Sequence, residues 1–115
     1  MRVSTNILYF LILSLLMVTP SIAADEEGQS LAFDRTKGNC LACHAIPNDK
    51  AAKSPGDIGP PLIGMKSRYP DRAKLRAQIW DATVTNSTSG MPPFGRNKIM
   101  TEAEIDKVTD YVYGL

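Results

Sequence analysis

Residues 38–44 read Gly38-Asn39-Cys40-Leu41-Ala42-Cys43-His44 and hold both cysteines and the only histidine of the 115-residue chain. Because two residues separate the cysteines, their sulfur atoms can lie along one edge of a planar ligand. The histidine follows directly and can reach the centre of that ligand from one side. A thiol pair followed by an imidazole indicates a single site that holds a cofactor or a metal.

The C-x-x-C-H pattern is typical of covalent haem c attachment. In such a site, each thiol forms a thioether bond with one vinyl group of the porphyrin, and the histidine binds the iron as its proximal ligand. We therefore expect one covalent haem c, attached to Cys40 and Cys43 and ligated by His44.

Three other interpretations of these residues compete with haem. A redox-active C-x-x-C pair usually belongs to a βαβ unit, and no strand is predicted here. A zinc site needs four ligands, so a carboxylate would have to complete the set that Cys40, Cys43 and His44 begin. A disulfide between the two cysteines would close too small a loop to stabilise the fold much.

Three helices are predicted, and no segment alternates apolar and polar residues as a strand would. The first runs from about Glu26 to Lys37 and is stopped by Gly38, and the second runs from about Pro70 to Thr85. The third follows Thr101, which forms a T-x-x-E capping box with Glu104. The predicted fold class is therefore all-α, with three main helices.

Two long loops, residues 45–69 and 86–98, separate these helices and are rich in proline and glycine. A compact domain rarely carries such loops unless they serve a function. A haem held between them would account for both loops.

The N-terminus has the three parts of a secretory signal peptide. Arg2 gives a positive start, Ile7 to Val18 is an apolar run of 12 residues interrupted only by Ser14, and small residues precede a cleavage site near Ala23 or Ala24. A membrane-spanning helix would need about 20 apolar residues. We expect residues 1–24 to be removed, residues 25–115 to form a periplasmic domain, and no membrane anchor to remain.

Without the signal peptide, the chain has 12 basic and 12 acidic residues. This balance argues against binding to nucleic acid or to a membrane surface. Five cations lie within residues 66–76: Lys66, Arg68, Arg72, Lys74 and Arg76. They form either a solvated helix face or a docking patch for an acidic partner.

Three methionines could supply the distal ligand of the iron, and a lysine, a tyrosine or an open position are the alternatives. Met100 precedes the cap of the third helix and is expected to pack there, and Met65 follows His44 too closely in the chain to reach the opposite side of the haem easily. Met91 stands outside any helix, beside two prolines that hold the backbone stiff. We expect Met91 to be the distal ligand.

The segment Gly59-Pro60-Pro61-Leu62 can run past the edge of the haem. Metal-bound histidines usually donate their second N–H to a carbonyl or carboxylate. The Pro60 carbonyl is the expected acceptor for His44 Nδ1, although a plain turn would explain the same sequence.

These motifs together resemble class I cytochrome c, and more specifically the SoxX family of small cytochrome subunits. The resemblance covers residues 33–115 and includes residues 69–73, 79–82 and 91–95: Tyr69-Pro70-Asp71-Arg72-Ala73, Ile79-Trp80-Asp81-Ala82 and Met91-Pro92-Pro93-Phe94-Gly95. It implies a class I cytochrome c fold, haem attachment at Cys40 and Cys43, His44 as proximal ligand and Met91 as distal ligand.

The resemblance also implies a periplasmic heterodimer with a larger cytochrome of the SoxA type, whose own haem centre handles sulfur. The pair would oxidatively couple thiosulfate to a cysteine of a SoxYZ-type carrier, and this subunit would pass electrons to a downstream cytochrome c. It implies no catalytic residue in this chain, since haem attachment would use both cysteines. The complex would be an L-cysteine S-thiosulfotransferase.

Two other function classes stay open on the sequence. One is a free periplasmic electron carrier with no obligate partner. The other is a haem sensor or peroxidase, which would need an open or weakly held sixth position on the iron.

Overall fold

The computed structural model describes residues 21–115 and contains helices but no strands in that part of the chain. The long helices are α2 (Ser21–Phe33), α4 (Arg72–Trp80) and α5 (Glu102–Tyr113). Three short helical pieces lie between them: η1 (Cys40–Ala42), α3 (Met65–Arg68) and η2 (Ala82–Val84). The all-α prediction is confirmed.

The predicted signal peptide falls on residues outside the described part of the chain, apart from the backbone of residues 21–24. It stays a prediction. α2 begins at Ser21, before the predicted start near Glu26. Among residues 21–115, no helix is both long enough and apolar enough to cross a membrane.

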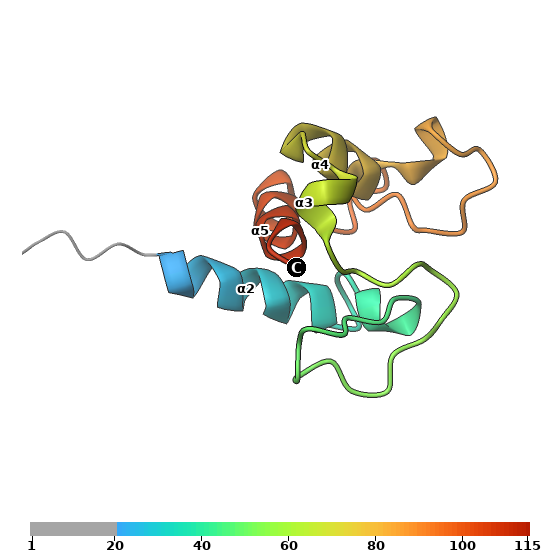
Figure 1. The fold of residues 1–115 in the computed structure, drawn as a ribbon. Coiled ribbons are helices and arrows are strands. Elements are labelled where there is room, and N and C mark those ends of the chain that lie inside the picture. The colour runs from blue at the N-terminus through green and yellow to red at the C-terminus, as the bar shows by residue number, and fades with distance from the viewer. Residues whose placement is uncertain (1–20) are drawn as a thin grey trace, which may run out of the picture.

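The closest helix packing is the crossing of α2 and α5 (Figure 1). Gly28 lies at this crossing, where a β-carbon would stand 2.3 Å from the Lys107 carbonyl oxygen and 2.8 Å from Tyr111 Cβ. Further along α2, the rings of Phe33 and Tyr111 meet edge to face with centroids 6.1 Å apart. The missing side chain of Gly28 therefore lets the two backbones approach each other.

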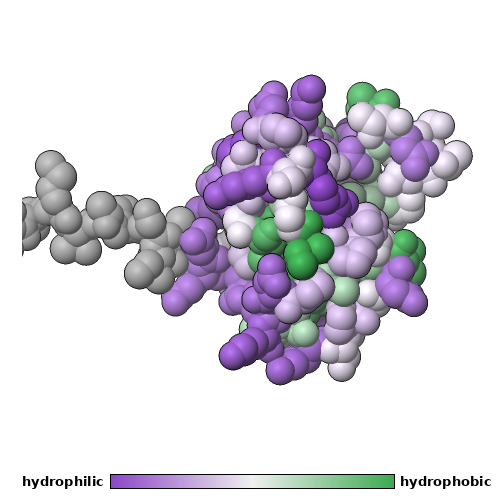
Figure 2. All heavy atoms as spheres, in the orientation of Figure 1, coloured by the Kyte–Doolittle hydropathy of each residue, from purple (hydrophilic) through white to green (hydrophobic). Residues whose placement is uncertain are grey.

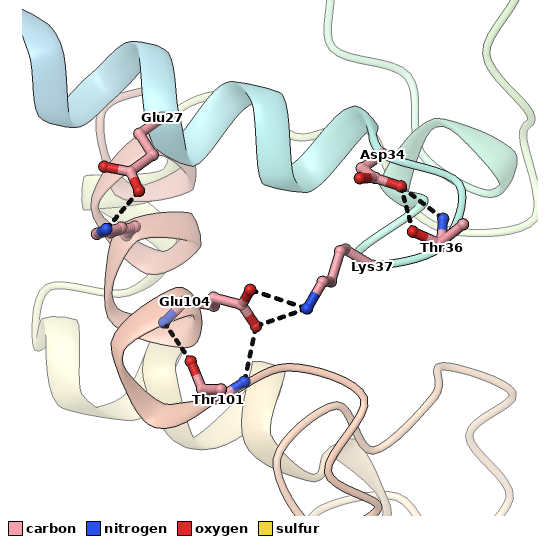
Figure 3. A network of polar contacts seen from close by, with 7 residues as sticks. Glu27, Asp34, Thr36, Lys37, Thr101 and Glu104 are labelled. Atoms are coloured by element: carbon pink, nitrogen blue, oxygen red, sulfur yellow. Dashed lines mark hydrogen bonds and ion pairs between the residues drawn. The ribbon is translucent and has the colours of Figure 1, made fainter.

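Polar contacts fix the first turn and the middle of α5 against the N-terminal part of the domain (Figure 3). The predicted capping box is present: Thr101 Oγ1 accepts from Glu104 N at 3.2 Å, and Glu104 Oε2 accepts from Thr101 N at 2.9 Å. Lys37 Nζ lies 2.8 Å from Glu104 Oε1. The bonds from Lys37 and from the Thr101 backbone lower the pKa of Glu104. Lys107 pairs with Glu27 of α2.

α4 is fastened to α5 by two ion pairs. Arg72 Nε lies 2.5 Å from Asp110 Oδ1, and Arg76 Nε lies 2.6 Å from Asp106 Oδ1. The Arg72 guanidinium also donates to the Asp106 carbonyl oxygen at 3.0 Å. These arginines belong to the predicted basic cluster, and their charge is largely met within the molecule.

The predicted end of the first helix near Lys37 is wrong, because α2 ends at Phe33. The Asp34 carboxylate accepts from the backbone N and from Oγ1 of Thr36, each at 2.7 Å. Such a local turn competes with the helical bonds. Gly38 N then donates to a carbonyl oxygen in the last turn of α2 at 3.1 Å, which turns the chain toward η1.

The predicted second helix, which ran to about Thr85, is also divided in the structure. α4 ends at Trp80, and Asp81 is extended, with φ −160° and ψ 95°. The Asp81 carboxylate accepts from Thr83 N at 3.0 Å and starts η2. α3 lies within the predicted first loop and follows Gly64, whose φ of 62° suits glycine.

The core gathers side chains from α2, α3, α4 and α5 and from the loops between them. Met65 and Met100, both expected to pack, are each 2% exposed. The outer face shown in Figure 2 is mostly polar, with a small apolar area near its centre. The remaining buried members of the core cluster are Ala32, Ile46, Leu62, Leu75, Ile79, Phe94, Ile105, Val108, Tyr111 and Val112.

Gly28→Ala is expected to destabilise the domain, although alanine normally favours a helix by up to about 1 kcal/mol over glycine. The added β-carbon would overlap the backbone of α5, and overpacking of this kind costs about 1–3 kcal/mol. Denaturant unfolding measures the change. Ser30→Ala, at an exposed position of the same helix, is the control and is expected to leave the stability nearly unchanged. A Gly28→Ala protein as stable as the control would show that α2 and α5 do not pack this closely.

Candidate cofactor site

One cavity of about 500 Å³ brings together all the site residues predicted from the sequence. Cys40, Cys43 and His44 line one part of it, and Pro60 and Met91 come to its wall from the two long loops. The volume falls within the range of about 300–1,000 Å³ that is common for small-molecule and cofactor sites. Apolar side chains from the core complete the lining: Leu62, Leu75, Ile79, Phe94, Val108 and Val112.

Cys40 is the first residue of the short helix η1, and Cys43 is its C-cap. Asn39 enters η1 in the left-handed conformation, with φ 46°, and Cys43 N and His44 N both donate to the Cys40 carbonyl oxygen, at 3.1 and 2.9 Å. This tight turn fixes the cysteine spacing. The two cysteines form no disulfide with each other.

Burial raises the pKa of the Cys40 thiol to about 11. Cysteines of thiol oxidoreductases instead have lowered pKa values, because the thiolate is the reactive form. The environment of Cys40 therefore disfavours the redox C-x-x-C interpretation. Zinc is no better supported, since no group of three or more His, Cys, Asp or Glu side chains in the described residues could hold a metal ion.

His44 is held in one orientation and one tautomer. Its Nδ1 lies 2.7 Å from the Pro60 carbonyl oxygen. Because a carbonyl oxygen can only accept, Nδ1 must carry a proton, and in the neutral imidazole the free lone pair is then on Nε2. Gly59 N donates to the Cys43 carbonyl oxygen at 2.7 Å, which keeps the Pro60 segment against the motif.

Gly59 leaves room for the imidazole ring. A β-carbon at this position would stand 2.3 Å from His44 Cε1 and 2.6 Å from Nδ1. Glycine is therefore needed here for close approach of the backbone to the ring, which the sequence alone did not reveal.

Met91 is half-buried and packs against the core cluster. Its loop returns to the end of α4, where Gly95 N donates to the Trp80 carbonyl oxygen at 3.1 Å. Met65 and Met100 also reach the cavity wall, but Met65 Sδ already accepts from Arg68 at 3.3 Å. Trp80 is half-buried and packs against the core cluster, with the Arg76 guanidinium 5.5 Å from its ring centroid.

Arg68 is a residue of the cavity wall that sequence analysis placed only in the basic cluster. Its guanidinium donates to the Pro61 carbonyl oxygen at 2.7 Å. Lys66, from the same helix, lies over the Tyr113 ring at 5.5 Å. Together with the ion pairs of Arg72 and Arg76, these contacts make most of the cluster part of the fold.

The residues present fit a haem. The cavity is largely apolar, two thiols stand on one side of it, and an imidazole with a free Nε2 and a thioether both reach its wall. Such donors suit haem iron, and the two thiols provide the points of covalent attachment.

Comparison with known proteins agrees with this fit. The family model described as "Cytochrome C oxidase, cbb3-type, subunit III" matches residues 23–112. The crystal structure of SoxXA from P. pantotrophus contains a chain with 28% sequence identity and a TM-score of 0.70, over 77% of this chain and 79% of that one. No curated protein of similar sequence was found.

Gly59→Ala is expected to displace the His44 ring and to lower the free energy of unfolding of the haem-loaded protein by about 1–3 kcal/mol. Denaturant unfolding followed at the haem absorption band measures this. Gly114→Ala is the control, because a β-carbon there lies outside the cavity and makes only ordinary contacts, the nearest 3.4 Å from the Tyr111 carbonyl oxygen. If both variants unfold like the unmutated protein, His44 is not confined by Gly59.

Proposed function

Since the chain belongs to the cytochrome c family whose model matches residues 23–112, we propose that it transfers electrons through a single haem c bonded to Cys40 and Cys43. One observation carries this proposal. The only two cysteines, the only histidine and Met91 all line one largely apolar cavity. When bound, haem supplies a one-electron couple of the iron, and the residues around it set its potential.

In this proposal His44 binds the iron through Nε2, and Pro60 keeps that nitrogen available. The bond from Nδ1 to the Pro60 carbonyl fixes the ring and raises the basicity of the ligand. Met91 fills the opposite position. A His/Met pair raises the reduction potential relative to two nitrogen ligands and leaves no position open to small molecules, which suits electron transfer.

The Met91 assignment predicts how the reduced protein responds to carbon monoxide. The unmutated protein is expected to bind it poorly, and Met91→Ala is expected to bind it readily, because the sixth position is then open. Absorption spectra of the reduced proteins measure this, with Met65→Leu as the control. Ready binding by the unmutated protein would favour the sensor or peroxidase class and reject Met91 as the ligand.

We further propose that the chain is the electron-transfer subunit of a SoxXA-type complex. Support comes from the likeness to a chain of the SoxXA structure, at 28% identity and over more than three-quarters of both chains. The partner would be a larger SoxA-type cytochrome. Haem attachment would use both cysteines of this chain, so the sulfur chemistry on thiosulfate and a SoxYZ-type carrier would take place on the partner. Electrons would leave to a downstream cytochrome c.

Export to the periplasm belongs to the same proposal. Cleavage near Ala23 or Ala24 would remove the first turn of α2 and leave the domain 25–115. The helix would then begin with Asp25, Glu26 and Glu27, whose negative charges suit the positive N-terminal end of a helix dipole.

Purification of the tagged chain from its own host, grown on thiosulfate, distinguishes a subunit from a free carrier. A second, larger haem polypeptide is expected to elute with it in equal amount. Recovery of the chain alone, with its haem, would favour the free periplasmic carrier. Growth without thiosulfate provides the comparison.

A further inference from the structure

The loop that carries Met91 is closed at both ends on the C-terminal part of α4 and on η2. Asn86 N donates to the Ala82 carbonyl oxygen at 3.1 Å, and Gly95 N donates to the Trp80 carbonyl oxygen at 3.1 Å. Both ends of the loop are therefore attached to neighbouring residues, at the end of α4 and in η2. Its ends are fixed, but these bonds do not set the conformation near Met91.

Inside the loop, side chains hold the backbone in two successive turns. Asn86 Oδ1 accepts from Thr88 Oγ1 at 2.8 Å and from Thr88 N at 3.2 Å, and Ser89 N donates to the Asn86 carbonyl oxygen at 2.9 Å. Ser89 Oγ then accepts from Met91 N at 3.2 Å. The first turn holds Ser89, and the Ser89 hydroxyl then closes the second turn on Met91.

The bond from Met91 N is the last one of this kind before the two prolines. Pro92 and Pro93 have no backbone N–H, so this part of the loop offers no further donor until Phe94. The Ser89 hydroxyl is therefore the group that fixes the Met91 backbone from the N-terminal side. It is half-buried and reaches the wall of the same cavity.

We propose that Ser89, supported by Asn86, is a positioning residue that holds Met91 ready to bind the iron. This inference rests on the proposed ligation by Met91 and goes beyond it. A thioether is a neutral ligand, and the entropy lost in ordering a flexible loop would weaken its bond to the iron. A loop already ordered by its own side chains loses less on binding, which is the effect of preorganisation.

Imidazole is a suitable probe, because it competes with the thioether for the sixth position of the oxidised protein. Removing one hydrogen bond of this kind weakens the closed loop by about two- to tenfold. Ser89→Ala is therefore expected to lower the apparent Kd of imidazole by about two- to tenfold. Asn86→Ala is expected to act in the same direction, because it removes the support of the Ser89 turn.

The chain offers matched controls for this experiment. Ser87 belongs to the same loop, is exposed, and its side chain has no hydrogen bond within the described residues, so Ser87→Ala is expected to match the unmutated protein. Ser89→Thr keeps the hydroxyl, and its apparent Kd for imidazole is expected to stay close to that of the unmutated protein. Asn86→Asp keeps an acceptor oxygen for Thr88 and tests the first turn. Thermal unfolding followed by helical circular dichroism is expected to differ little among them.

The outcomes separate this inference from the ligand assignment. If Met91→Ala binds imidazole no more tightly than the unmutated protein, Met91 is not the ligand and both proposals fail. If Met91→Ala binds it more tightly but Ser89→Ala equals the unmutated protein, the positioning role fails and the ligand assignment stands. An equal change in Ser87→Ala and Ser89→Ala would also overturn the role of the Ser89 bond.

Discussion

The close crossing of α2 and α5 is the constraint on which the other parts of the described structure depend. Because Gly28 has no side chain, the two helices approach closely enough for α5 to serve as a support for the rest. Arg72 and Arg76 bind α4 to its side, and Lys37 joins the chain before the cysteine motif to its first turn. Tyr111 of α5 donates to Asp49 Oδ2 at 2.6 Å and so holds the first loop. The cavity wall is built from elements that each contact this helix or rest on one that does.

Within this frame, the two sides of the cavity are fixed by different means. The cysteine and histidine side depends on backbone bonds in and around η1 and on the carbonyl of Pro60. The methionine side depends on a loop whose polar side chains bond its own backbone. Haem bound as proposed would join the two sides. A cavity arranged in this way suits a cofactor whose surroundings change little between two oxidation states.

The sequence predicted the features that follow from local chemistry. The cysteine motif and the Thr101–Glu104 box each depend on residues a few positions apart. The helix ends were missed where a short polar side chain competed with the helix, as Asp34 and Asp81 do. Arg68 was missed because its acceptor is a loop carbonyl, and no sequence pattern marks such a contact. The need for Gly59 likewise appears only when the ring of His44 stands against it.

The pairing of α2 with α5 also has a consequence for the order in which the molecule is completed. The two helices are far apart along the described chain, so a chain that emerges N-terminus first cannot form their crossing until α5 has followed α2. Closing so long a loop also makes folding slower than local helix formation. If haem is attached as proposed, Cys40 and Cys43 would be accessible for attachment before this late contact forms. The separation of α2 and α5 along the chain would thus leave time for modification of a motif that follows α2 by only a few residues.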